Sequence, residues 1–430
     1  MILLPVFIII PVTACIIEYF FIKLKTKYEG LIPLIASLIT VVLSLYSAFN
    51  VPNDFYLPWI HQWNIDIEFS LNGISNIFMT TCSIAFLVQT ILSLNKQKRQ
   101  SYWCMNLFLQ AAIFSFILSQ NLAVKIISWE LCWVPIFVIL VNTEKGHTAI
   151  RFSKIWFFAQ ALLICGTIIM IGKFSRIYDA AFWLMLVALI TRTYLNISSR
   201  FKSEITILIN VIVPLLPIIF FTNTLLPSFY KYIETNTLII AISLCIINLI
   251  WIFKLIASRA IHTIYTVNVA VFSGFILVWL LKPELQVLQL CIQIVVVKTI
   301  LGIIMTYYGR DCSCIRNKWV LIISLLLSFG FSGIIIGIPM LKIISLWNTY
   351  QQAIAISILC LLFVLFTATV VKISKLFNYQ KTEAKKQEWP EIIKLVTVSI
   401  IFIGIVSALT ELPYIKEQVK KPEINNAKYI

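Results

Sequence analysis

The chain has 430 residues, of which 60% are hydrophobic and only 12% are charged, and its mean hydropathy is +0.95. Soluble domains carry about twice that fraction of charged residues, so the composition excludes a water-soluble globular protein and indicates an integral membrane protein. The net charge of +16 does not indicate nucleic-acid binding, because the sequence has no soluble basic face with interleaved aromatic residues.

Fourteen apolar segments are each close to 20 residues long, which is enough to cross the hydrocarbon core of a bilayer. They predict an all-α polytopic membrane protein with one integral membrane domain over residues 1–430. The predicted helices are 2–22, 31–49, 73–94, 104–119, 123–142, 152–172, 180–196, 204–222, 237–256, 261–281, 286–308, 319–341, 350–374 and 391–410.

The charges of the connecting loops support this count, because Lys and Arg collect on the cytoplasmic side of a membrane. Basic residues gather in every second predicted loop, and the loops between them are poor in Lys and Arg. The basic loops begin with Lys23, Lys25 and Lys27, and continue through Lys96 and Arg99 to Lys381 and Lys385. Omission of one helix would destroy the alternation, so the pattern predicts fourteen spans with both termini outside.

The sequence contains no signature of an enzyme with its own cofactor. The ten cysteines fall mostly in or beside predicted helices, and Cys312 and Cys314 form a single Cys-x-Cys pair without the further ligands that a metal needs. There is no phosphate-binding Gly-rich loop, haem-attachment motif or iron–sulfur spacing. We therefore expect no metal or cofactor in this chain, and we expect its chemistry to be transport.

Charged side chains within the apolar segments are the strongest functional signal. A charge near the bilayer centre costs about 3 kcal/mol or more, and such residues usually face a protein interior or a water path. The candidates for a proton relay are Glu130, Arg192, Lys298 and Lys342. Buried carboxylates and lysines can exchange protons near neutral pH, whereas arginine stays charged and is better suited to setting a field.

Each candidate also has a structural alternative. Glu130 can form a snorkelling ion pair with Lys125, and Arg192 can snorkel towards the basic loop that follows it. Lys298 can serve helix packing alone, and Lys342 can mark the end of a helix. Another carboxylate, Glu18, lies beside Lys23, and a snorkelling pair explains it.

The predicted twelfth helix, 319–341, contains three glycines and Pro339, and Lys342 follows it. Helices broken by Gly and Pro at membrane depth form ion sites in many transporters. Close helix packing through the glycines is the alternative.

Several of these segments resemble those of a known family. The segments Leu57-Pro-Trp-Ile60 and Ser70-Leu-Asn-Gly-Ile-Ser75 resemble its entry to the third helix, and Trp129-Glu-Leu-Cys-Trp-Val-Pro135 resembles its fifth-helix motif Trp-Glu-x-x-x-Val-Pro. Weaker likeness occurs at Phe158-Ala-Gln160 and over Tyr265–Phe275. The chain thus resembles an antiporter-like subunit, most of all the M-type, of proton-pumping NADH:quinone oxidoreductase (respiratory complex I). This family is related to Mrp-type sodium/proton antiporter subunits.

The resemblance implies an antiporter-like fold with inverted repeats and broken helices. It divides the domain into leading helices (1–119), a first half (120–260), a second half (261–378), and a final helix with a polar tail (379–430). Glu130 matches the fifth-helix glutamate implicated in pumping, Lys298 and Lys342 lie near polar positions of the eleventh and twelfth helices, and Asn210 and Asn268 are supporting polar residues.

The sequence also departs from the family pattern. The seventh-helix lysine has no direct match, with Arg192 about one turn away, and the eighth-helix lysine is missing near Asn210 and Pro214. The family's Asp before Gly73 is Asn72, and Phe272 occupies the position of its tenth-helix histidine. These losses favour a degenerate relay as one interpretation.

The resemblance predicts a non-redox, proton-translocating subunit in a multi-pass arrangement in the bacterial inner membrane, or alternatively the mitochondrial inner membrane. Its partners would be other membrane subunits of a respiratory complex and the lipid bilayer, with no nucleic acid. Quinone, NADH, flavin and iron–sulfur clusters would belong to the partner subunits. A subunit of a multisubunit sodium/proton antiporter, or a structural subunit that no longer transports, is the alternative.

Overall fold

The computed structural model describes residues 3–23, 30–50, 52, 54–60, 65–94, 101–143, 146–172, 178–194 and 215–257. This part of the chain forms two compact units, one ending at Ser153 and the other starting at Lys154, and each is considered separately. The five helices predicted after residue 257 lie outside the described residues, so the total of fourteen helices stays a prediction.

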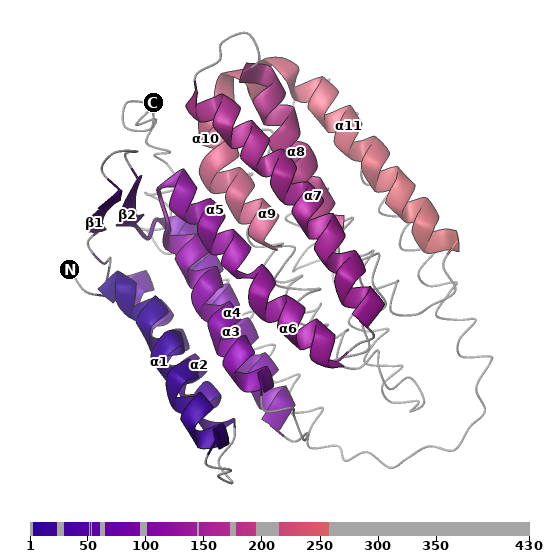
Figure 1. Cartoon of the computed structure of the whole chain (residues 1–430). Coiled ribbons are helices and arrows are strands. Elements are labelled where there is room, and N and C mark those ends of the chain that lie inside the picture. The colour runs from indigo at the N-terminus through magenta and orange to yellow at the C-terminus, as the bar shows by residue number, and fades with distance from the viewer. Residues whose placement is uncertain are drawn as a thin grey trace, which may run out of the picture. The chain divides into compact units, whose positions relative to one another are not determined.

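The first unit is a helical bundle with one β-hairpin (Figure 1). Helix α1 packs against α4 and α2, α2 packs against α3, and α4 packs against α5 and α6. The elements are α1 (Leu3–Lys23), α2 (Leu31–Phe49), β1 (Phe55–Ile60), β2 (Ile65–Phe69), α3 (Gly73–Leu94), α4 (Ser101–Leu118), α5 (Leu122–Leu131), α6 (Trp133–Thr143) and the beginning of α7 (Gly146–Ile171).

The second unit contains the rest of α7, then α8 (Tyr178–Tyr194), α9 (Leu215–Phe220), a π-helical turn (Phe221–Leu225), α10 (Leu226–Ser228) and α11 (Tyr230–Ala257). Phe182 of α8 packs against the rings of Phe229 and Tyr232. Helix α11 bends at Asn236, whose φ of −109° and ψ of 16° are not helical. The sequence predicted a helix from residue 237, which is where the regular part of α11 begins.

Seven described stretches are long and apolar enough to cross a membrane, so the prediction of a multi-pass membrane protein is confirmed for this part of the chain. Helices α2 and α3 have the predicted bounds, 31–49 and 73–94. The seven stretches are Leu3–Lys23, Leu31–Phe49, Gly73–Ile91, Ser101–Leu118, Leu122–Asn142, Ala149–Ile171 and Tyr230–Ile250.

The β-hairpin was not predicted, because residues 50–72 were assigned to a loop without Lys or Arg between two predicted helices. Strands β1 and β2 are antiparallel, and the Tyr56 hydroxyl donates a hydrogen bond to Asp66 Oδ2 at 2.7 Å. This bond raises the pKa of the Tyr56 phenol above its usual range. The hairpin also joins the α4–α5 connection, since Gln120 N–H donates to the Glu68 carbonyl at 2.9 Å. The end of α4 and the start of α5 therefore lie at the hairpin end of this unit.

A second contact fixes the opposite end of the same unit. Asn142 Nδ2, near the end of α6, donates to Ser101 Oγ at the start of α4 with a distance of 3.0 Å. Helix α4 thus runs towards the hairpin, and the α5–α6 segment runs back from it. This alternation of direction agrees with the one predicted from the loop charges.

Glu18 is not a snorkelling residue as the sequence predicted. Its side chain is fully buried in α1, and its Oε1 accepts a hydrogen bond from the Gly30 N–H at 3.0 Å. Gly30 has a φ of +88°, and a Cβ there would lie 2.9 Å from side-chain atoms of Leu94 and Trp103. Only glycine fits this turn before α2 without strain, and Glu18 holds the turn in place.

Candidate functional site

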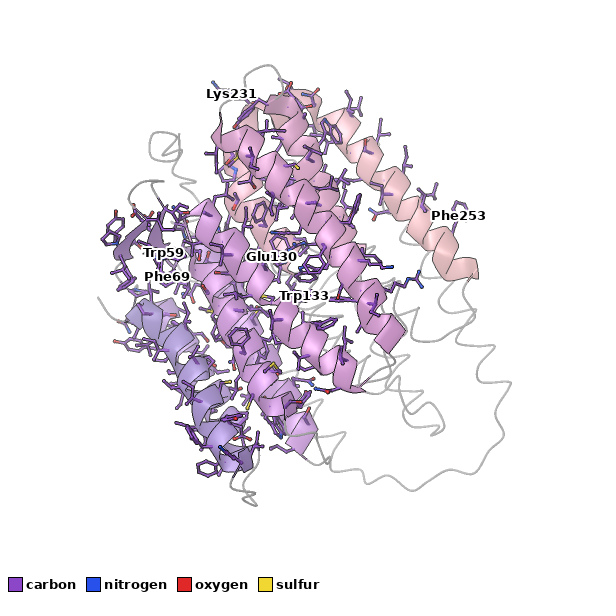
Figure 2. The ribbon with its side chains drawn as sticks, in the orientation of Figure 1. Trp59, Phe69, Glu130, Trp133, Lys231 and Phe253 are labelled. Carbon is purple, nitrogen blue, oxygen red and sulfur yellow. The ribbon has the colours of Figure 1, made fainter. Side chains whose placement is uncertain are left out.

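The Trp-Glu…Val-Pro motif lies where one predicted helix, 123–142, is broken into α5 and α6. Asn121 caps the start of α5, because its side-chain oxygen accepts from Ala123 N–H at 2.9 Å. Pro135 cannot donate to the carbonyl four residues before it, and its ring would crowd that carbonyl. The helix accordingly ends at Leu131, and Cys132 N–H turns to the Trp129 carbonyl at 3.1 Å. Figure 2 shows Glu130 and Trp133 on the two sides of this break.

Two contacts hold α5 against α4 just before the glutamate. The hydroxyls of Ser128 and Ser115 are 2.7 Å apart, and the buried ring of Trp129 packs edge-on against Phe116 with centroids 5.0 Å apart. These contacts join successive residues of α5 to α4, so they fix the rotation of α5 about its own axis. The orientation of the motif is therefore set by helix α4.

On the other side of the break, Trp133 fixes α6 in the same manner. Its indole Nε1 donates to Ser153 Oγ at 3.2 Å, and its ring stacks on Phe137 with centroids 4.9 Å apart. Ser153 belongs to the first turns of α7 and lies in the same unit. The two tryptophans of the motif thus anchor the two helical pieces to different neighbours.

Glu130 is half-buried at the end of α5. It is the ninth residue of a 21-residue apolar stretch that begins at Leu122, which places it about 12 Å along the helix from that residue at 1.5 Å per residue. This position is near the middle of the span. The snorkelling ion pair with Lys125 stays an alternative interpretation of Glu130.

Lys125, which the sequence suggested only as an ion-pair partner of Glu130, is a buried charged residue. It is only 2% exposed and lies on the buried face of α5 together with Val124, Ser128 and Trp129. The signal that could have located it is Asn121, because an N-cap at that position puts Lys125 in the first turns of the helix. Lysines are almost never fully buried unless paired, so Lys125 joins the candidate site.

Arg192 forms a separate charged centre in the second unit. Its side chain is fully buried on α8, it donates to Gln160 Oε1 of α7, and its guanidinium carbon lies 4.5 Å from the ring centroid of Trp156. The alternative in which Arg192 snorkels to a membrane surface is therefore wrong. A guanidinium stays protonated under all ordinary conditions. The arrangement supplies a fixed positive charge inside the second unit.

The remaining predicted site residues, Lys298, Lys342, Asn210 and Asn268, lie outside the described residues, and their roles stay predictions. Glu130 and Arg192 belong to different units. Within the described ranges, no group of three or more His, Cys, Asp or Glu side chains could hold a metal ion.

Comparison with known protein sequences gives two kinds of relative. The chain is 25% identical over 198 residues to NADH-quinone oxidoreductase subunit M of Buchnera aphidicola, covering 41% of this chain and 39% of the relative. It is 27% identical over 158 residues to a Staphylococcus aureus protein named as the antiporter subunit mnhA2, covering 34% of this chain and 20% of the relative. The alignments thus span about two fifths and one fifth of these relatives, and no family profile matches.

Solved structures match nearly the whole chain at low sequence identity. A chain of an archaeal membrane-bound sulfane sulfur reductase matches with a TM-score of 0.78 and 11% identity, and the alignment covers 97% of this chain and 96% of that one. A chain of respiratory complex I from Thermus thermophilus matches with a TM-score of 0.74 and 10% identity, covering 96% of this chain and 99% of that one. A chain of the Mrp complex from Dietzia matches with a TM-score of 0.73 and 10% identity, and the alignment covers 97% of this chain and 52% of that one.

These comparisons confirm the resemblance inferred from the motif. The sequence relatives are an M subunit of NADH-quinone oxidoreductase and Mrp-type antiporter subunits, and the structural neighbours are membrane chains of multisubunit complexes. The chain is therefore a mostly helical, multi-pass membrane protein with the fold of the antiporter-like subunits.

Proposed function

We propose that the chain is a non-redox, proton-translocating membrane subunit of an NADH:quinone oxidoreductase-type complex. The observation that carries this proposal is the presence of charged side chains inside the bundle, with Lys125 and Arg192 buried and Glu130 near the middle of a span. Such groups are expensive at membrane depth and are typical of ion and proton pathways. The similarity to subunit M supports the same assignment.

In this proposal the proton moves along charged residues in sequence. Glu130 changes its protonation as a neighbouring positive charge shifts, and the proton passes towards Lys298 and then Lys342 for release. Lys125 lies on the same helix as Glu130, at the hairpin end of α5, and supplies a second charged group on that helix. Arg192 is held rigidly by Gln160 and Trp156, so it sets a field and does not carry the proton.

The proposal includes the finer architecture expected for this fold: fourteen helices in two inverted repeats with broken helices, both termini outside, in a bacterial inner membrane. The break between α5 and α6 is one such interruption within the described residues. Neighbouring membrane subunits would dock beside the chain, and NADH, flavin, iron–sulfur clusters and quinone would react in other subunits.

A subunit of a multisubunit sodium/proton antiporter is the second candidate, because the Staphylococcus aureus relative and the Dietzia Mrp chain are similar to this chain at comparable levels. The Trp-Glu…Val-Pro motif favours the first candidate. Copurification from native membranes in mild detergent separates the two. Quinone-reductase and iron–sulfur subunits in the purified complex would support the first candidate, and antiporter subunits alone would support the second.

The role of Glu130 is tested by Glu130→Gln in inverted membrane vesicles, where proton pumping and quinone reduction are measured together. We expect pumping per electron to fall severalfold, because a glutamine cannot exchange a proton. The matched control is Glu234→Gln, since Glu234 is an exposed carboxylate on α11. Unchanged pumping in Glu130→Gln would contradict the relay and favour a structural subunit that no longer transports.

A further inference from the structure

Four buried polar side chains lie where α2 meets α4, away from the Glu130 motif. They are Ser37 and Thr40 of α2 and Asn106 and Gln110 of α4, each at most 1% exposed. Gln110 Nε2 donates to Thr40 Oγ1 at 3.0 Å. Ala36 and Leu107, which adjoin Ser37 and Asn106 in sequence, pack in one apolar cluster. Ser37 lies one turn before Thr40 and Asn106 lies one turn before Gln110, and both helices run towards the hairpin end, so these four residues, called here the α2–α4 polar cluster, occupy two adjacent turns at this hydrogen bond.

The hydrogen-bonding capacity of this cluster is largely unused by the described protein atoms. Within the described ranges, no group bonds to Oδ1 or Nδ2 of Asn106, to Oε1 of Gln110 or to the Ser37 hydroxyl. An amide left unpaired in an apolar medium costs several kcal/mol, and in a bilayer core there is no bulk water to satisfy it. Three unsatisfied groups within one turn of an interhelical hydrogen bond therefore point to a bound ligand.

The chemistry of the cluster identifies the ligand class. The Thr40 hydroxyl donates its proton to the Ser37 carbonyl at 2.9 Å, so Thr40 Oγ1 acts towards its neighbours as an acceptor. The cluster offers hydroxyl and amide oxygens together with an amide N–H, and none of its four members is charged. A cation would need a counter-charge at this depth, whereas water both donates and accepts and is bound where two to four polar groups converge.

We propose that the α2–α4 polar cluster binds ordered water inside the leading helices. The water bridges Asn106, Gln110 and Ser37 and satisfies the groups that no described protein atom reaches. The site contains no titratable side chain. It is therefore distinct from the Glu130 relay, and it stands whether or not the proposed function holds.

The polar lining continues from this site along α2 towards the hairpin end of the unit. Ser44 and Ser47 are fully buried and follow Thr40 at helical spacing, and Ser47 Oγ donates to Asn76 Oδ1 of α3 at 3.3 Å. From Ser37 to Ser47 the stripe rises about 15 Å at 1.5 Å per residue, about half of a hydrocarbon core of roughly 30 Å. Water at the cluster would thus lie at the inner end of a hydroxyl-lined route.

The direct test is a high-resolution cryo-EM map of the protein in its native complex in a lipid nanodisc. We expect density peaks at hydrogen-bonding distance, about 2.8 Å, from the Asn106 amide and from Gln110 Oε1. Direct bonds from these atoms to protein groups, with no density between them, would overturn the proposal. A peak with six or more oxygen ligands at about 2.3–2.6 Å would identify a cation and would also overturn it.

Unfolding of the detergent-solubilised protein provides a second test. Asn106→Leu keeps a similar volume but removes the amide, so the water loses a partner and Gln110 and Ser37 are left unsatisfied. We expect the folding equilibrium to shift about tenfold towards the unfolded state. Combining Asn106→Leu with Gln110→Leu and Ser37→Ala removes the orphaned groups and should recover much of that loss. If the amide has no water partner, Asn106→Leu will stabilise the protein, and that outcome refutes the proposal.

Discussion

Arg192→Lys tests whether the buried guanidinium is held by two simultaneous contacts. Arg192 reaches Gln160 and at the same time lies 4.5 Å from the ring centroid of Trp156. Lysine keeps the positive charge but lacks the planar fork that permits both contacts. A hydrogen bond to a charged group contributes about 1.5–3 kcal/mol, and a desolvated cation–π contact contributes about 2 kcal/mol.

Since lysine can retain one of the two contacts, we expect Arg192→Lys to lower the free energy of unfolding by about 2 kcal/mol, which is about 30-fold in the unfolding equilibrium constant. The assay is unfolding in mixed micelles with increasing SDS, followed by far-ultraviolet circular dichroism. Arg151→Lys is the matched control, because Arg151 is exposed on α7, and it should change little.

A double-mutant cycle with Trp156→Leu identifies the contact that is lost. If lysine keeps Gln160 and gives up the ring, Trp156→Leu will be much less destabilising in the Arg192→Lys background than in the wild type. Equal stability of Arg192→Lys and the wild type would refute the reasoning, since the two contacts would then contribute nothing beyond the charge.

Three further outcomes follow from the structure. Lys125→Met should reduce proton pumping severalfold in vesicles, because it removes a buried positive charge from the helix that carries Glu130, while Lys154→Met, at an exposed position of α7, should not; equal pumping in both variants would remove Lys125 from the site. Asn121→Ala should destabilise the protein by about 1 kcal/mol in the SDS unfolding assay, because it removes the side-chain cap of α5, and a smaller loss is expected from Asn121→Ser, which keeps a capping oxygen. Gly166→Ala should destabilise the packing of α7 on α8 by about 1–3 kcal/mol, because its Cβ would lie 2.7 Å from Met185 Cγ and 3.0 Å from the Ala181 carbonyl oxygen; Gly146→Ala, where a Cβ meets no described atom within 4 Å, should be neutral or stabilising.

The local elements were predictable to the extent that they depend on neighbouring residues. Apolar length alone located α2 and α3, and the Asn236 bend explains why the predicted helix began at residue 237. The hairpin was missed because its strands are short and its pairing is completed by Ser70 and Gln120, which bond to backbone groups of Leu118 and Glu68. The alternation of apolar and polar residues over Ile65-Asp-Ile-Glu-Phe69 is the strand signal that could have located it.

Some residues of the candidate site were likewise predictable from the sequence, and others were not. Glu130 was found because a carboxylate within an apolar run is visible from the sequence, and its motif carried the resemblance that the comparisons confirmed. Lys125 was missed, and Arg192 was left with two interpretations, because a charged residue near the end of an apolar run can either snorkel or turn inwards. Only the neighbouring helices decide between these outcomes.

The sequence by itself determined that this protein spans a membrane and that charged residues lie within its apolar segments, because hydrophobic length and the presence of a charge are properties of single segments. The tertiary structure decided which charges are buried and what they contact. Trp156 and Gln160 meet Arg192 from another helix, and Thr40 meets Gln110 from a segment 70 residues away. Hydropathy measures how apolar a helix is, whereas the face it turns towards its neighbours is set by packing between helices.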